Sequence, residues 1–251
     1  MDFEAWGRLG ILLVRPGALV MTTPLFGTPF APAQVRLGLT VLFAMLVAPV
    51  VEVPALATTP AMTWVIGREM ALGIAMGLSI RILVAVAEGA GQLTGYQVGL
   101  SYGAMLDPQS GVRNSTLAIL YANLTLVLCL LLGVHHEVIR AWLASYEVLP
   151  IGVGSVDPSI GPLVARTLGF IFIGALRLAA PVIAVLMVVE VMMGLMSRAA
   201  PSLNLLVVGA PLRLPVGLLV AAAALAALPT LLTRLLPGAL ELAVGAARAF
   251  R

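Results

Sequence analysis

Long apolar runs, separated by short polar or proline-rich breaks, fill almost the whole of this 251-residue chain. A helix that crosses the hydrocarbon core of a bilayer needs about 20 mainly apolar residues. The uncharged windows 114–134 and 214–233 are the cleanest candidates for such spans. The pattern predicts an all-α membrane protein with about six helical regions, some of them kinked or broken. These regions are 5–23, 35–51, 61–103, 115–146, 159–199 and 206–236.

Prolines inside these regions predict breaks in the helices. Pro181 lies within a long apolar run and should kink its helix, because proline lacks a backbone N–H and its ring clashes with the preceding turn. Pro201, Pro211 and Pro215 surround residues 204–209. This spacing predicts a re-entrant turn or a short hairpin there, rather than a continuous helix.

The composition agrees with this membrane pattern. Hydrophobic residues make up 61% of the chain and charged residues only 10%, and the mean hydropathy is +1.10. An ordinary soluble domain has about 25% charged residues. No stretch of normal polarity is long enough to fold separately in water, so we interpret residues 1–251 as a single integral domain.

Charge and motif content exclude several classes of function. All fourteen basic residues are arginines that are scattered singly, whereas a nucleic-acid binder needs a basic face, so no nucleic acid is expected as a partner. The lone cysteine, Cys129, cannot form a disulfide within the chain or a multi-thiolate metal site. His135-His136-Glu137 lacks the HExxH spacing, and no serine stands in a GxSxG context. We therefore expect no catalytic, metal-binding or cofactor-binding residues, and no enzyme.

Charged side chains within the apolar runs need partners or water, because a charge near the bilayer centre costs about 2.5–3.5 kcal/mol. Glu69, Gly73, Gly77 and Arg81 follow one ridge with a spacing of four, so this stripe should face protein. Such charges form a polar lining or inter-subunit ion pairs, or they mark helix ends near the lipid headgroups. The charges predicted to be buried are Glu69, Arg81, Glu88, Arg177 and Glu190.

A second ridge consists of glycines alone: Gly91, Gly95, Gly99 and Gly103. Residues four apart lie on one flank of a helix, and small residues at this spacing let another backbone approach closely. Glycine also costs roughly 0.5–1 kcal/mol relative to alanine inside a helix, so this segment is easier to bend than its neighbours. We predict that these four glycines pack against a close neighbour. The segment is interpreted either as plain helix packing or as a moving part.

The glycine ridge runs into a polar break, Asp107-Pro108-Gln109-Ser110-Gly111, inside an otherwise apolar chain. Non-helical backbone at membrane depth is tolerated only where it is buried in protein or lines a water-filled cavity. A loop inside a pore satisfies this requirement.

The same stretch carries a resemblance to a known family. The sequence from Gly95 to Tyr102, followed by Leu106-Asp107-Pro108, resembles the signature of the FliR and SctT family of type III export-gate proteins. Further matches follow in the expected order and cover most of the chain. They are Arg36–Leu39 to Ala48-Pro49, Ser145-Tyr146 to Leu149–Gly152, Arg198–Asn204, and Val208–Pro211 to Val216–Leu218.

The resemblance implies a flagellar subunit in the bacterial inner membrane, at the basal body. Members of that family join FliP and FliQ, with FlhB and FlhA as further partners, in a closed helical assembly. Their hydrophobic segments pack against sister subunits as tilted, broken hairpins. The assembly makes the pore through which unfolded flagellar proteins leave the cytoplasm.

The family's plug region maps onto about residues 98–115 of this chain. The resemblance implies a loop that projects into the lumen, with Tyr102, Met105 and Leu106 as bulky stoppers. The family often has phenylalanines at the stopper positions, so Tyr102 and Met105 imply a weaker or differently shaped seal. The plug residues are Tyr102, Met105, Leu106, Asp107, Pro108, Gln109, Ser110 and Gly111.

Three alternatives remain open at the sequence level. A self-contained secondary transporter would use Glu88, Arg177 and Glu190 as its binding site, but such proteins show paired inverted halves. Here only a Leu-Gly pair before Arg81 and another before Arg177 echo each other. The others are a subunit of a virulence secretion system and a passive scaffold. Transport by the isolated chain in liposomes would identify a transporter.

Overall fold

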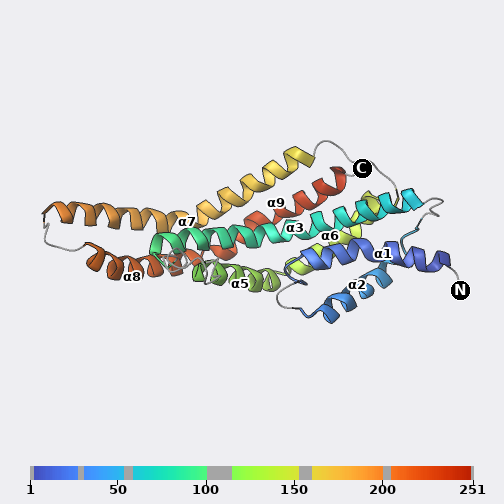
Figure 1. Cartoon of the computed structure of the whole chain (residues 1–251), viewed down its shortest axis with the longest axis horizontal. Coiled ribbons are helices and arrows are strands. Elements are labelled where there is room, and N and C mark those ends of the chain that lie inside the picture. The colour runs from blue at the N-terminus through green and yellow to red at the C-terminus, as the bar shows by residue number, and fades with distance from the viewer. Residues whose placement is uncertain are drawn as a thin grey trace. The chain divides into compact units, whose positions relative to one another are not determined.

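The computed structural model describes residues 3–27, 31–53, 59–100, 115–152, 160–199 and 205–249. Helices are the only regular secondary structure in these ranges (Figure 1), and this confirms the predicted all-α class. The helices are α1 (Phe3–Thr22), α2 (Ala33–Val47), α3 (Thr59–Val98), α5 (Thr116–Leu131), α6 (Val134–Val148), α7 (Ile160–Ala199), α8 (Leu205–Leu225) and α9 (Leu228–Ala249).

Several of these helices have the length and apolarity of membrane spans. Two segments, Ala61–Val98 in α3 and Ala165–Ala199 in α7, are long and apolar enough to cross a membrane. Two further pairs, α5 with α6 and α8 with α9, qualify only as broken spans, because they bend by 70° and 53°. The described part of the chain is therefore that of a membrane protein, with two to four segments that are long and apolar enough to cross a bilayer.

The two windows that the sequence marks as the cleanest spans, 114–134 and 214–233, each contain one of these bends. The first bend lies at Gly133, whose φ of 71° is in the left-handed region that glycine adopts easily. The second lies between Leu225 and Leu228, where Pro229 follows in the first turn of α9. A proline ring clashes with the carbonyl four residues earlier, so α8 cannot continue in a straight line.

The predicted re-entrant turn at residues 204–209 is wrong for the described positions. Helix α8 runs without a break from Leu205 to Leu225 and contains both Pro211 and Pro215. Helices in membrane proteins tolerate proline because neighbouring groups and local adjustments satisfy the freed carbonyls. Pro181 likewise lies inside α7 rather than at its end.

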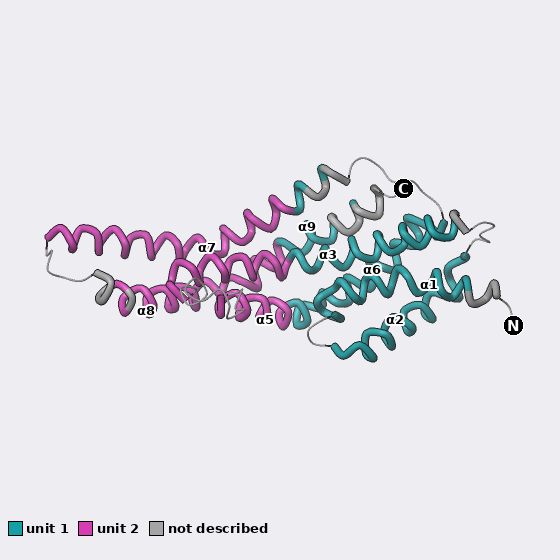
Figure 2. The backbone as a smooth tube through the Cα atoms, in the orientation of Figure 1, with its two compact units in different colours: residues 1–82, 129–167, 235–251 teal, residues 83–128, 168–234 magenta. Residues whose placement is uncertain are grey.

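The chain divides into two compact units (Figure 2). Unit 1 comprises residues 1–82, 129–167 and 235–251, and unit 2 comprises residues 83–128 and 168–234. The long helices α3 and α7 contribute residues to both units. The single integral domain predicted over residues 1–251 stays a prediction.

In unit 1, α1 and α3 pack so closely that their backbones touch. A Cβ atom on Gly73 would overlap the backbone oxygen of Arg15, and one on Gly77 would overlap the side chain of Thr22. Both glycines are buried, on the same ridge as Glu69. Small residues at this spacing allow such a close approach, so this part of the ridge faces α1.

Candidate functional site

The C-terminal half of α3 carries the glycine ridge, and its first glycine touches α5 in unit 2. A Cβ atom on Gly91 would lie 2.6 Å from the Cα atom of Ala118 and 2.6 Å from the carbonyl oxygen of Leu117. These are backbone atoms, which cannot move aside as a flexible side chain can. Gly91 therefore lies at a close approach between α3 and α5, and the role predicted for the ridge as a whole stays a prediction. Gly95 is also buried, and Gly103 lies outside the described residues.

Gly99 ends α3 instead of packing within it. Its φ is 96°, in the left-handed region, and its N–H donates to the carbonyl oxygens of Gly95 at 3.1 Å and Tyr96 at 3.2 Å. A glycine in this conformation just after the last helical turn is a common helix terminator. The sequence ridge therefore has two functions, close packing at Gly91 and helix termination at Gly99.

The left-handed conformation predicts the effect of a small substitution at Gly99. We expect Gly99→Ala to lower the free energy of unfolding by about 1–2 kcal/mol, because a Cβ atom is strained in this region. The measurement is the temperature at which the single, buried thiol of Cys129 reacts with a fluorogenic probe. Gly194→Ala is the control, since Gly194 is helical and a Cβ atom there would have open space. Equal midpoints for the two variants would contradict the prediction.

Residue Ser115 holds the start of α5 against α3. Its backbone N–H donates to Oε1 of Gln92 at 2.9 Å, and its hydroxyl oxygen accepts from the N–H of Leu117 at 3.3 Å. The second bond caps the first turn of α5. Gln92 and Gly99 are separated by seven residues, which is about 10 Å along a helix. The chain thus leaves α3 at Gly99 and comes back to the same helix at Gln92.

The segment between these two anchors, residues 101–114, lies outside the described residues. It contains Gly103 and all of the predicted plug residues: Tyr102, Met105, Leu106, Asp107, Pro108, Gln109, Ser110 and Gly111.

A polar cluster joins the last turns of α3 to α7 and α8. Glu190 of α7 accepts a hydrogen bond from Nε2 of Gln97 at 3.4 Å and lies 3.5 Å from Nη2 of Arg213. The side chains of Arg213 and Glu190 are 30% and 39% exposed, so water reaches the pair. The sequence indicated Glu190 as a charge in need of a partner. It gave no signal for Gln97 and Arg213, because their proximity to Glu190 depends on how three helices pack.

Apolar contacts hold the same end of α3. A Cβ atom on Gly217 would lie 2.5 Å from Cγ2 of Val98, so α8 packs directly on this turn. The buried cluster here also includes Val182 and Leu186 of α7 and Ala221 of α8. The end of α3 is therefore fixed from two sides, immediately before the segment that leaves at Gly99.

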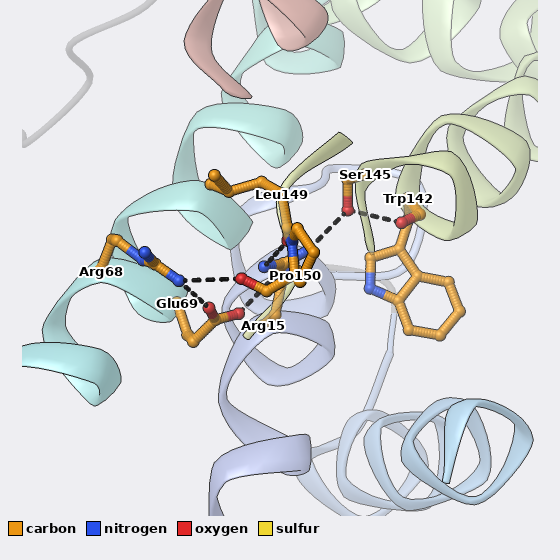
Figure 3. Close-up of polar contacts among 7 residues, drawn as sticks. All are labelled: Arg15, Arg68, Glu69, Trp142, Ser145, Leu149 and Pro150. Carbon is orange, nitrogen blue, oxygen red and sulfur yellow. Dashed lines mark hydrogen bonds and ion pairs between the residues drawn. The ribbon is translucent and has the colours of Figure 1, made fainter. Parts of the chain in front are cut away.

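Unit 1 contains a buried ion cluster that joins α1 and α3 (Figure 3). Nε of Arg15 lies 2.6 Å from Oε2 of Glu69, and Nη2 of Arg68 lies 3.2 Å from Oε1 of the same carboxylate. Arg15 and Glu69 are completely buried. Burying a carboxylate and two guanidinium groups costs free energy, and the attraction between the paired charges offsets this cost. Removing one member therefore leaves a buried charge without its partner, which is strongly destabilising.

The remaining donors of the two arginines extend the cluster to α6 and the turn after it. Arg15 donates to the Ser145 hydroxyl oxygen at 3.0 Å and to the Leu149 carbonyl oxygen at 3.1 Å. Arg68 donates to the Pro150 carbonyl oxygen at 3.1 Å. The Arg15 guanidinium also lies 4.1 Å from the centroid of the Tyr146 ring. Sequence reasoning identified Glu69 but not its two arginines, although Arg15 interrupts an apolar run just before Pro16.

The other charges that the sequence predicts to be buried have different environments in the chain by itself. Arg81 and Arg177 are exposed, and Glu88 is half-buried. Burial of Arg81 and Arg177 therefore stays a prediction about an assembly with other subunits. Among the described residues, no group of three or more histidine, cysteine or acidic side chains is arranged to hold a metal ion.

Comparison with known proteins adds an independent finding. The model of a family described as bacterial export proteins, family 1, matches residues 7–238. The chain is 32% identical over 229 residues to the flagellar biosynthetic protein FliR of Pectobacterium carotovorum subsp. carotovorum, covering 87% of each chain. It is 31% identical over 214 residues to FliR of Escherichia coli (strain K12), covering 84% of this chain and 81% of the relative. It is 27% identical over 212 residues to FliR of Bacillus subtilis (strain 168), covering 82% and 81%.

Proposed function

This chain belongs to the bacterial export proteins, family 1, and from that membership we propose that it is a subunit of the flagellar type III export gate. Its proposed location is the flagellar basal body in the bacterial inner membrane. Together with FliP and FliQ, and beside FlhB and FlhA, it forms the pore through which unfolded flagellar proteins leave the cytoplasm. The proposed role is structural and gating, without a catalytic step.

Exposed apolar surface on a short helix supports an assembly. Helix α2 has 15 residues, about 22 Å, which is less than the roughly 30 Å of a bilayer core. It nevertheless exposes 58% of Leu37, 51% of Leu42 and 66% of Met45. A helix that is too short to span a bilayer and is apolar on its outer face fits burial against companion subunits.

The observation that carries the gating role is the pair of anchors on α3. One end of residues 101–114 leaves at Gly99 and the other is bonded to Gln92 through Ser115. Both ends of the polar segment are therefore attached to one helix, whose end packs against α7 and α8. This arrangement suits a loop that blocks a lumen, because α3 alone sets the position of both of its ends.

Shortening the proposed plug should open the pore. We expect replacement of Leu106–Gly111 by two glycines to raise the ion conductance of the reconstituted complex severalfold, while FliP and FliQ still co-purify with the variant. Planar-bilayer recording measures the conductance, and mass identification after mild-detergent extraction measures the assembly.

The matched control likewise replaces residues 153–158, in the connection between α6 and α7, by two glycines and should leave conductance at the wild-type level. Unchanged conductance in the Leu106–Gly111 variant would count against the plug. Failure of FliP and FliQ to co-purify with the wild-type chain would count against the proposed assembly itself.

A further inference from the structure

A cavity of about 670 Å³ lies within unit 1, between the C-terminal end of α2 and helix α6. Its apolar wall includes Leu46, Val47 and Val50 on one side and Ile139 and Leu143 on the other. Pockets of about 300–1,000 Å³ with mostly apolar walls are typical binding sites for small ligands. This size and lining suit a single amphiphilic molecule better than the broad groove that a helix about 10 Å wide would need.

Packed aromatic rings form one end of the cavity. The ring centroids of Phe43 and Trp142 are 5.1 Å apart, and Trp142 meets Tyr146 edge-on at 5.7 Å. Tyr146 is held in turn by the Arg15 guanidinium, which belongs to the buried ion cluster. The wall is therefore packed against the buried ion cluster of unit 1.

Two neighbouring buried donors in this wall have no acceptor other than each other. Trp142 and Tyr146 line the cavity and are 0% and 7% exposed. Apart from a polar contact between the two side chains themselves, neither the indole Nε1 of Trp142 nor the phenol oxygen of Tyr146 has a hydrogen-bond partner in the part of the chain that the structure describes. Buried polar atoms in native proteins nearly always have a partner. A ligand with oxygen acceptors would satisfy both groups.

The rim of the cavity carries negative charges, and a positive charge lines a neighbouring cavity. Glu52 and Glu147 line it, both are exposed, and neither forms an ion pair within the described ranges. A second cavity of about 540 Å³, which shares Val51 and Glu52 with the first, is lined by Arg8. An apolar hollow thus borders two free carboxylates and, next to them, one guanidinium.

We propose that this cavity binds a zwitterionic phospholipid with a primary ammonium headgroup, of the phosphatidylethanolamine class. The acyl chain lies against Leu46, Val50 and Leu143, and lipid oxygens accept from Trp142 and Tyr146. The ammonium contacts Glu52 and Glu147, and Arg8, which lines the neighbouring cavity, pairs with the phosphate. A lysine on a partner helix would also match the carboxylates, but it would supply no anion for Arg8 and no acceptor for the two buried donors.

The test compares two lipids that have the same acyl chains. Native mass spectrometry of the full-length chain in detergent measures binding of dioleoyl phosphatidylethanolamine and of dioleoyl phosphatidylglycerol, which has no ammonium. We expect the ethanolamine lipid to bind about tenfold more tightly, and this preference to disappear in the Glu52→Gln/Glu147→Gln double variant. Glu241→Gln, an exposed carboxylate on α9 outside the cavity, should keep the full preference.

Filling the cavity with a larger side chain distinguishes lipid binding at this site from nonspecific adhesion of lipid to the apolar surface. Leu143→Trp and Val50→Trp, at side chains that are 45% and 80% exposed, should each reduce binding of both lipids without exposing the Cys129 thiol. Equal binding of the two lipids by the wild-type chain would overturn the headgroup assignment. Unchanged binding in both tryptophan variants would overturn the cavity as the site, as would a photo-crosslinker at Leu143 that captures a partner subunit and no lipid in the assembled complex.

Discussion

Glu69→Gln is expected to destabilise the protein by about 3–5 kcal/mol, because it leaves the buried Arg15 and Arg68 without their shared carboxylate. Arg15 has no access to water, so it cannot recover its hydration when the partner is lost. Cys129 reactivity during heating measures the change as a lower midpoint. The loss should also loosen α6, since Arg15 donates to Ser145 and to the Leu149 carbonyl oxygen.

Glu137→Gln provides the matched control for the buried cluster. It breaks the Glu137–Arg140 pair, whose side chains are 42% and 75% exposed and which lies on one face of α6. Exposed pairs of this kind contribute at most about 0.5 kcal/mol, so the midpoint should barely move. Similar midpoints for the Glu69 and Glu137 variants would show that the buried cluster does not carry the stability assigned to it.

Gly91→Ala is expected to separate α3 from α5 and to lower the free energy of unfolding by about 1–3 kcal/mol, the usual cost of overpacking. The added Cβ atom would meet backbone atoms of Leu117 and Ala118 at 2.6–2.8 Å. Because Gln92 is the next residue, the shift should also break its bond to the N–H of Ser115. Protease cleavage between residues 100 and 115 should therefore become faster than in the wild-type chain.

The control for Gly91→Ala is Gly169→Ala in α7, where a Cβ atom has open space. Alanine favours a helix over glycine by roughly 0.5–1 kcal/mol, so this variant should be as stable as the wild type or more so. The two identical substitutions should thus have opposite effects. If Gly91→Ala were also stabilising, the close contact between α3 and α5 would not exist in the folded protein.

Much of the architecture could be predicted from apolar periodicity, but the breaks between helices could not. The sequence predicts a single helical region at 115–146, yet it divides at Gly133, which adopts a left-handed φ of 71°. In contrast, Pro211 and Pro215 are strong breakers by sequence and remain inside α8. The local sequence indicates which backbone conformations have a low energy at each residue. The packing of neighbouring helices decides which of these conformations the chain adopts.

For the candidate sites, too, the sequence predicted some features but not the contacts between helices. The spacing of Glu69, Gly73 and Gly77 indicated a face toward protein, and the structure shows α1 packed on it. The spacing of the second ridge did not indicate that Gly99 ends the helix. The partners Gln92, Arg15 and Arg213 were missed, because a side chain in one helix gives no sign of the helix that it will meet.

By itself, the sequence determined that this is a helical membrane protein of the export family, since hydropathy and ordered motifs are local properties that survive without coordinates. Only the tertiary structure decided which charges neutralise one another and which glycines touch a neighbouring backbone. It also decided that both ends of the polar segment meet one helix. The reason is physical: the energy of a buried ion pair or a close backbone contact depends on distances between residues far apart in the chain, which periodicity does not encode.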